Sequence, residues 1–124
     1  MKDLKEIIKQ TPVVLNIWGS TDQVFESFDG YSPSDKVARE KVNILFASYG
    51  DENYSGSAFV LFEKDGQLFE VNGGHCSCYG LEGQWEPEKV VLAELENRLT
   101  KGSFGTDTYS GNPFAEELKT FLGI

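Results

Sequence analysis

The chain has 124 residues, 40% of them hydrophobic and 13% aromatic, which is enough for one folded domain and argues against extensive disorder. No run approaches the roughly 20 consecutive apolar residues of a membrane-spanning helix. Twenty acidic residues against eleven basic ones give a formal net charge of −9, a field that repels nucleic-acid backbones and anionic membranes.

The first third of the chain predicts short elements. Residues 3–10 carry apolar side chains at helical spacing and predict a helix. A run of β-branched and aromatic residues predicts a strand over 13–18. Residues 22–28 fit either a helix, capped by Ser20 or Thr21, or a strand.

The middle of the chain predicts an antiparallel meander. Ser32, followed by proline, predicts the N-cap of a short charged helix that ends where a strand over 42–49 begins. Two further strands, 57–63 and 67–72, flank Asp65-Gly66, a dipeptide typical of tight hairpins.

Two helices follow in the last third. The first is predicted to start at Pro87 and to end near Gly102, and the second to start at Asn112-Pro113 after a polar loop. Their spacing predicts these inward-facing side chains: Val91, Leu92, Leu95, Leu99, Phe114, Leu118, Phe121 and Leu122.

Helices at both ends of a meander predict an α+β fold in one domain, residues 1–124. We expect an antiparallel sheet of three or four strands packed with the N- and C-terminal helices. The amino-terminal residues mix both signs of charge and precede no long apolar run, so they do not look like a signal peptide. The expected location is therefore cytoplasmic, where cysteines are usually reduced thiols.

The stretch from Gly73 to Pro87 holds the single histidine and both cysteines of the chain. His75, Cys76 and Cys78 are three candidate metal ligands, but a structural zinc site normally has four, in two separated pairs. We therefore expect no cofactor and favour small apolar packing for the cysteines, with zinc as the alternative.

Two reactive alternatives for the same stretch are less favoured by the sequence. A Cys–His nucleophilic pair needs its base within hydrogen-bond reach and a third group to orient it, and no such third group is indicated. Redox chemistry is disfavoured because the spacing is Cys-x-Cys and a disulfide between residues i and i+2 is strained.

Aromatic side chains next to acids in predicted loops indicate an interface, because tyrosine and tryptophan are common interface anchors. No basic patch interleaved with aromatics accompanies them, so the expected partner is a protein with a basic surface. The predicted interface residues are Asp51, Glu52, Tyr54, Tyr79, Glu82, Trp85 and Glu86.

The run Gly-Gly-His-Cys-Ser-Cys-Tyr-Gly-Leu-Glu-Gly-Gln-Trp-Glu-Pro, with the two strands before it, resembles a family of small acidic bacteriophage and prophage proteins of unassigned activity. The resemblance covers residues 42–100. It leaves 1–30 as a variable N-terminal element and does not reach 103–124. No catalytic residues are carried over from that family.

Small acidic phage proteins are often accessory factors, so the resemblance implies a non-enzymatic protein that binds and inhibits a host protein in the host cytoplasm. A restriction or CRISPR nuclease, whose nucleic-acid channel is basic, is the kind of target it implies. The alternative hypothesis is a metal- or thiol-dependent site at His75, Cys76 and Cys78.

Overall fold

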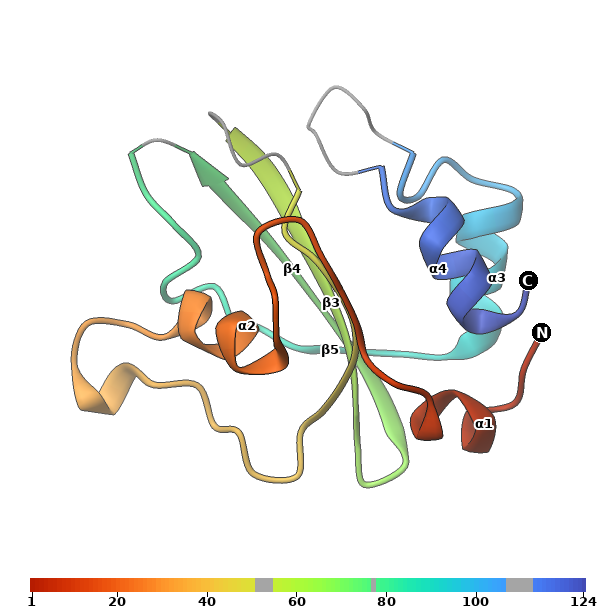
Figure 1. The fold of residues 1–124 in the computed structure, drawn as a ribbon, viewed down its shortest axis with the longest axis horizontal. Helices are drawn as coiled ribbons and strands as arrows, with labels where there is room; N and C mark the ends of the chain where they lie inside the picture. The colour runs from red at the N-terminus through yellow and green to blue at the C-terminus, as the bar shows by residue number, and fades with distance from the viewer. Residues whose placement is uncertain (51–54, 77, 107–112) are drawn as a thin grey trace.

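The computed structural model describes residues 1–50, 55–76, 78–106 and 113–124 (Figure 1). In chain order its elements are α1 (Leu4–Lys9), β1 (Val13–Leu15), α2 (Thr21–Phe28), a 3₁₀ turn η1 (Pro33–Asp35), β2 (Asn43–Ser48), β3 (Ser55–Lys64), β4 (Gln67–Cys76), β5 (Glu88–Val90), α3 (Leu92–Thr100) and α4 (Ala115–Leu122).

The strands form one five-stranded sheet in the order β1-β2-β3-β4-β5. β1 runs parallel to β2, and the other neighbours are antiparallel. The predicted α+β class is confirmed, and so is the β2-β3-β4 meander. The predicted sheet was too small. The strand predicted over 13–18 forms as β1 and joins the sheet, whereas β5 has three residues and carries too short a pattern to be recognised.

The β3–β4 hairpin dominates the sheet. Its turn is formed by Asp65 and Gly66, whose φ angles of 52° and 81° belong to the tight turn that this dipeptide predicts. Both strands are longer than predicted. The pairing runs from Lys64 and Gln67 at the turn to Ser55 and Cys76 at the open end, so the start of the Gly73–Pro87 stretch is strand rather than connection.

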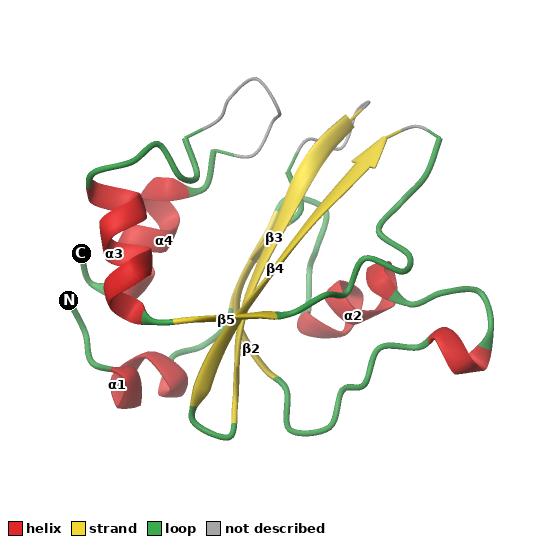
Figure 2. Cartoon of the chain, turned by 180° about the vertical axis from the view of Figure 1, so that it is seen from behind, coloured by secondary structure: helices red, strands yellow, loops and turns green. Residues whose placement is uncertain are grey.

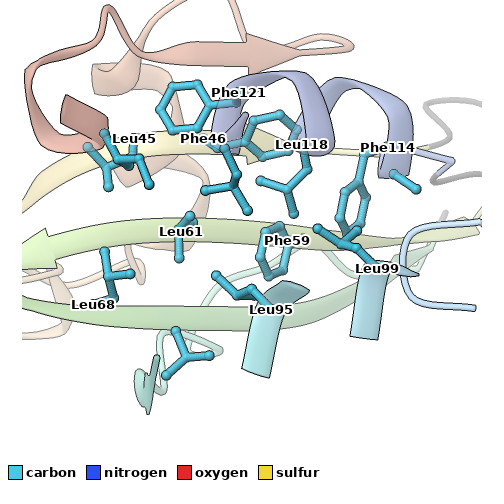
Figure 3. Packing of buried hydrophobic residues seen from close by; sticks show 14 residues of the cluster. Leu45, Phe46, Phe59, Leu61, Leu68, Leu95, Leu99, Phe114, Leu118 and Phe121 are labelled. Carbon is cyan, nitrogen blue, oxygen red and sulfur yellow. The ribbon is translucent and has the colours of Figure 1, made fainter. Parts of the chain in front are cut away.

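Helices cover both faces of the sheet. α3 and α4 lie on one side, with α1 near the turn of the hairpin, while α2 lies on the other side (Figures 1 and 2). The core on the α3/α4 side consists of Ile7, Leu45, Phe46, Phe59, Leu61, Leu68, Val90, Leu95, Leu99, Phe114, Ala115, Leu118, Phe121 and Leu122 (Figure 3). The core on the α2 side consists of Trp18, Val24, Phe25, Phe28, Val37, Ile44, Ala47, Ala58, Val60, Phe62, Val71 and Leu81.

This arrangement explains why residues 58–62 are apolar at every position, with no alternation between apolar and polar side chains. Phe59 and Leu61 point into one core, and Val60 and Phe62 point into the other. β3 is therefore a central strand covered on both faces.

The amino-terminal segment docks on the sheet. β1 pairs with β2, and the amide of Lys2 donates to the carbonyl of Leu122 at 2.8 Å, which holds the two ends of the chain together. The strand ends at Leu15, before the predicted 13–18 range is complete, because Asn16 adopts a left-handed φ of 70°. The structure resolves residues 22–28 in favour of the helix, which is capped by Ser20.

The predicted charged helix before residue 42 is wrong. Only the turn η1 forms, and the Ser32 hydroxyl bonds the Asp35 carboxylate at 2.7 Å instead of capping a backbone amide. Lys36 is extended, and the residues after it are tied to Asp29, which accepts from the amide of Val37 and pairs with Arg39 at 2.6 Å. That ion pair lowers the pKa of Asp29 through the hydrogen bond from the guanidinium.

The helix predicted from Pro87 starts later than expected. Glu88–Val90 pairs with β4 as β5, and α3 begins only at Leu92. Val91, expected in the buried stripe, is therefore 58% exposed, whereas Leu95 is fully buried. The last helix starts at Ala115, and its predicted cap at residue 112 lies outside the described residues.

None of the helices within the described residues is long and apolar enough to cross a membrane.

Two substitutions, one on α3 and one at its N-cap residue Val91, test this placement. Leu95→Ala should lower the free energy of unfolding by about 2–5 kcal/mol, because it empties space in the core. Val91→Ala should change it by less than about 0.5 kcal/mol, because that side chain is exposed. Denaturant titration of both variants measures the difference, and equal losses would mean that both side chains are buried.

Candidate functional site

The segment 78–87 crosses the α2 side of the sheet and closes the core there. Leu81 is buried and packs against Gly73, where an added Cβ would lie 2.9 Å from Leu81 Cδ2. The amide of Gly83 donates to the carbonyl of Phe28, which ties the segment to the end of α2. The segment is therefore fixed to both β4 and α2.

Trp85 takes part in this closure. Its ring stacks on Phe62, with centroids 5.3 Å apart and planes 13° apart, and meets the Phe28 ring edge-on at 5.1 Å. The ring of Phe25 lies 5.8 Å away. Although predicted as an interface residue, Trp85 is half-buried and packs mainly into the molecule.

Gln84 is the residue that sequence reasoning missed. Its side-chain amide donates to the carbonyls of Gly74 at 2.7 Å and Gly80 at 2.9 Å, and its oxygen accepts from the amide of Gly74 at 2.8 Å. One side chain thus joins the end of β4 to the start of the loop. No pattern in the sequence indicates this role, since a glutamine between Gly83 and Trp85 reads as an ordinary loop residue.

His75 packs on Tyr49, and its side chain points to the opposite face of β4 from that of Cys76. It is 6% exposed, its ring stacks on Tyr49 with centroids 3.9 Å apart, and its Nε2 lies 2.9 Å from the Tyr49 carbonyl oxygen. The Tyr49 ring in turn packs edge-on against Trp18, with ring centroids 5.3 Å apart. The imidazole therefore packs on an aromatic column, and Nε2 is occupied by a hydrogen bond to a carbonyl.

The two sulfurs lie together at the end of β4. The amide of Cys78 donates to Cys76 Sγ at 3.3 Å, and the amide of Cys76 donates to the Tyr79 carbonyl at 2.9 Å. The pKa of Cys76 is lowered, chiefly by the hydrogen bond from the Cys78 amide and in part by one from the Tyr79 backbone, against an opposing effect of burial. Cys76 is half-buried and Cys78 is exposed.

The zinc alternative gains no further ligands. In the described part of the chain, no three or more His, Cys, Asp or Glu side chains are grouped so that they could hold a metal ion. Using His75 Nε2 as a ligand would also break its contact with the Tyr49 carbonyl. The expectation of no cofactor and its zinc alternative both stay predictions.

The structure describes only some of the residues of the predicted interface, which stays a prediction. Asp51, Glu52 and Tyr54 lie outside the described residues. On the loop, Glu82 and Glu86 are exposed, and Tyr79 is 60% exposed.

Basic residues are unevenly distributed around this loop. The sequence contains no Lys or Arg in 10–35, and between 42 and 88 only Lys64, which lies at the β3–β4 turn, the opposite end of the hairpin from Cys76. α2, next to the loop, adds the exposed acids Asp22 and Glu26. The loop and α2 therefore carry exposed acids and no Lys or Arg in their own segments, and the cations beside them are Arg39, over the Phe25 ring, and Lys36, in a pocket that Trp85 also lines.

Comparison with protein-family models, with curated proteins and with solved structures finds no match to this chain.

Gln84 supplies a test of the loop's attachment. Gln84→Ala should lower the free energy of unfolding by about 1–3 kcal/mol, because Gly74 and Gly80 lose their partners. Gln84→Glu should cost at least as much near neutral pH, because a carboxylate of the same size accepts one bond but cannot donate to two carbonyls.

Glu86→Gln, the reverse exchange at an exposed position of the same loop, is the control and should change stability by less than about 0.5 kcal/mol. Thermal or denaturant unfolding measures all three variants. A Gln84→Glu protein as stable as the wild type would refute the role assigned to the amide.

Proposed function

We propose that this protein is a phage-type accessory protein that binds a host protein through the loop after β4 and inhibits it. The observation that carries the proposal is Tyr79, a large aromatic side chain that is 60% exposed on a loop otherwise fixed to the core. Tyrosine supplies contact area with few rotatable bonds, and a loop held in place loses little conformational entropy on binding.

The charge around Tyr79 supports a basic partner. Glu82 and Glu86 are exposed on the same loop, and the adjoining segments of the sheet carry no Lys or Arg within 65–88. Electrostatic complementarity speeds encounter with a positively charged surface and disfavours acidic partners. A nuclease whose basic channel holds nucleic acid has the complementary charge.

The state of His75 supports a binding role over a Cys–His nucleophile. The ring is buried against Tyr49 and its Nε2 faces a backbone carbonyl, so these contacts hold it as a structural residue. In this arrangement the histidine helps to fix the open end of the sheet from which the loop leaves.

The test begins with capture of partners from host lysate on the tagged protein, followed by affinity measurements with the purified partner. Tyr79→Ala should weaken binding roughly tenfold or more, because the anchor is removed. The pair Glu82→Lys and Glu86→Lys should weaken binding further and remove most of its dependence on salt.

The matched control reverses two exposed acids on the other face of the sheet, Glu94→Lys on α3 and Glu117→Lys on α4. It changes the net charge equally but should leave affinity nearly unchanged. The partner's own activity is then measured with and without the protein. Affinity that is the same for the loop variants and the control, or a partner whose activity is unaffected, would contradict the proposal.

A further inference from the structure

The end of β4 brings two thiols into a defined geometry. Two hydrogen bonds define it: the Cys76 amide donates to the Tyr79 carbonyl at 2.9 Å, and the Cys78 amide donates to Cys76 Sγ at 3.3 Å. Since that sulfur already contacts the backbone of residue 78, the Cys78 side chain is within reach of it. The Cys-x-Cys spacing disfavoured redox chemistry at the level of the sequence, but the structure brings the Cys76 and Cys78 thiols together.

The surroundings favour the charged form of one sulfur. The Cys78 amide donates to Cys76 Sγ and stabilises the Cys76 thiolate, because a hydrogen bond to the charged form favours that form. The pKa of Cys76 is accordingly lowered. A thiolate, unlike a thiol, is the species that attacks disulfides.

We propose that this pair is a thiol-modification site for low-molecular-weight disulfides, with Cys76 as the attacking thiolate and Cys78 as the resolving thiol. In the first step Cys76 Sγ attacks one sulfur of a disulfide R–S–S–R. The Cys76 S–S–R bond forms, and one thiolate R–S⁻ leaves.

In the second step Cys78, after losing its proton to solvent, attacks Cys76 Sγ and releases the second R–S⁻. The two cysteines are oxidised to a disulfide, and R–S–S–R is reduced to two thiols. Because a ring closed between residues i and i+2 is strained, the product is easily reduced again, as expected of a reversible modification rather than a structural bond.

Exposure assigns the two roles. Cys78 is open to solvent and able to resolve a mixed disulfide, while Cys76 is half-buried and polarised by backbone amides. His75 is not needed as a base, since its Nε2 is bonded to the Tyr49 carbonyl. The inference concerns chemistry within this loop and is independent of the proposed partner.

The experiment treats the reduced full-length protein with excess glutathione disulfide, blocks residual thiols by alkylation and maps the products by mass spectrometry. The wild type should lose two hydrogens through a Cys76–Cys78 disulfide and retain no glutathione. Cys78→Ser should instead keep one glutathione on Cys76. The wild type carrying glutathione mainly on Cys78 would overturn the proposal.

A second measurement needs no variant and so does not depend on how a mutant folds. In limited alkylation of the reduced wild type near neutral pH, Cys76 should react roughly threefold or more faster than Cys78, and the preference should vanish in denaturant, where the amide contact is lost. Equal rates in the folded protein, or a preference that persists in denaturant, would refute the assignment of Cys76 as the attacking thiolate.

Discussion

The β3–β4 ladder is the constraint on which the rest of the structure depends. Its strands pair along their whole length from the Asp65-Gly66 turn to Cys76, and the central strand is apolar on both faces. Each face must therefore be covered. The helices α3 and α4 cover one face, and α2 and the 78–87 loop cover the other. Because alternate side chains point to opposite faces, this ladder also decides that His75 and Cys76 face different ways.

The loop keeps its place because three kinds of contact act on it together. Leu81 fills the space that Gly73 leaves free, Trp85 stacks on Phe62, and Gln84 satisfies the backbone groups of the glycines on either side. Apolar packing alone would leave those backbone groups without partners, which is costly near a core. The side chains left outside by this arrangement, Tyr79 among them, are the ones available for recognition.

Binding and thiol chemistry share this loop without needing the same atoms. Recognition would use the exposed ring of Tyr79 and the acids beside it, whereas thiol exchange would use the sulfur of Cys76 at the end of the strand. The aromatic column of Trp18, Tyr49 and His75 supports both, because it anchors the open end of the sheet.

Local signals in the sequence determined much of the fold. Asp65-Gly66 specified the hairpin because few other dipeptides adopt two left-handed φ angles. Ser20 was one of two candidate caps for the helical alternative at residues 22–28, and it caps α2. Periodic apolar side chains identified α1, α4 and most of α3. These features depend on neighbours in the chain, so they can be read without the fold.

Tertiary contacts decided the remainder. β5 exists because the longer β4 pairs with it, and pairing with β2 makes β1 a parallel edge strand. Val91 is exposed because β5 delays the start of α3. The hydrogen bonds of the Gln84 side chain to Gly74, and the one between His75 and the Tyr49 carbonyl, join residues that are far apart in the sequence. The β3–β4 ladder and the 78–87 loop bring these residues together. The sequence alone picked out the Gly73–Pro87 stretch by its unusual composition. Only the fold shows that its histidine is held by Tyr49 and that the Cys78 amide bonds Cys76 Sγ.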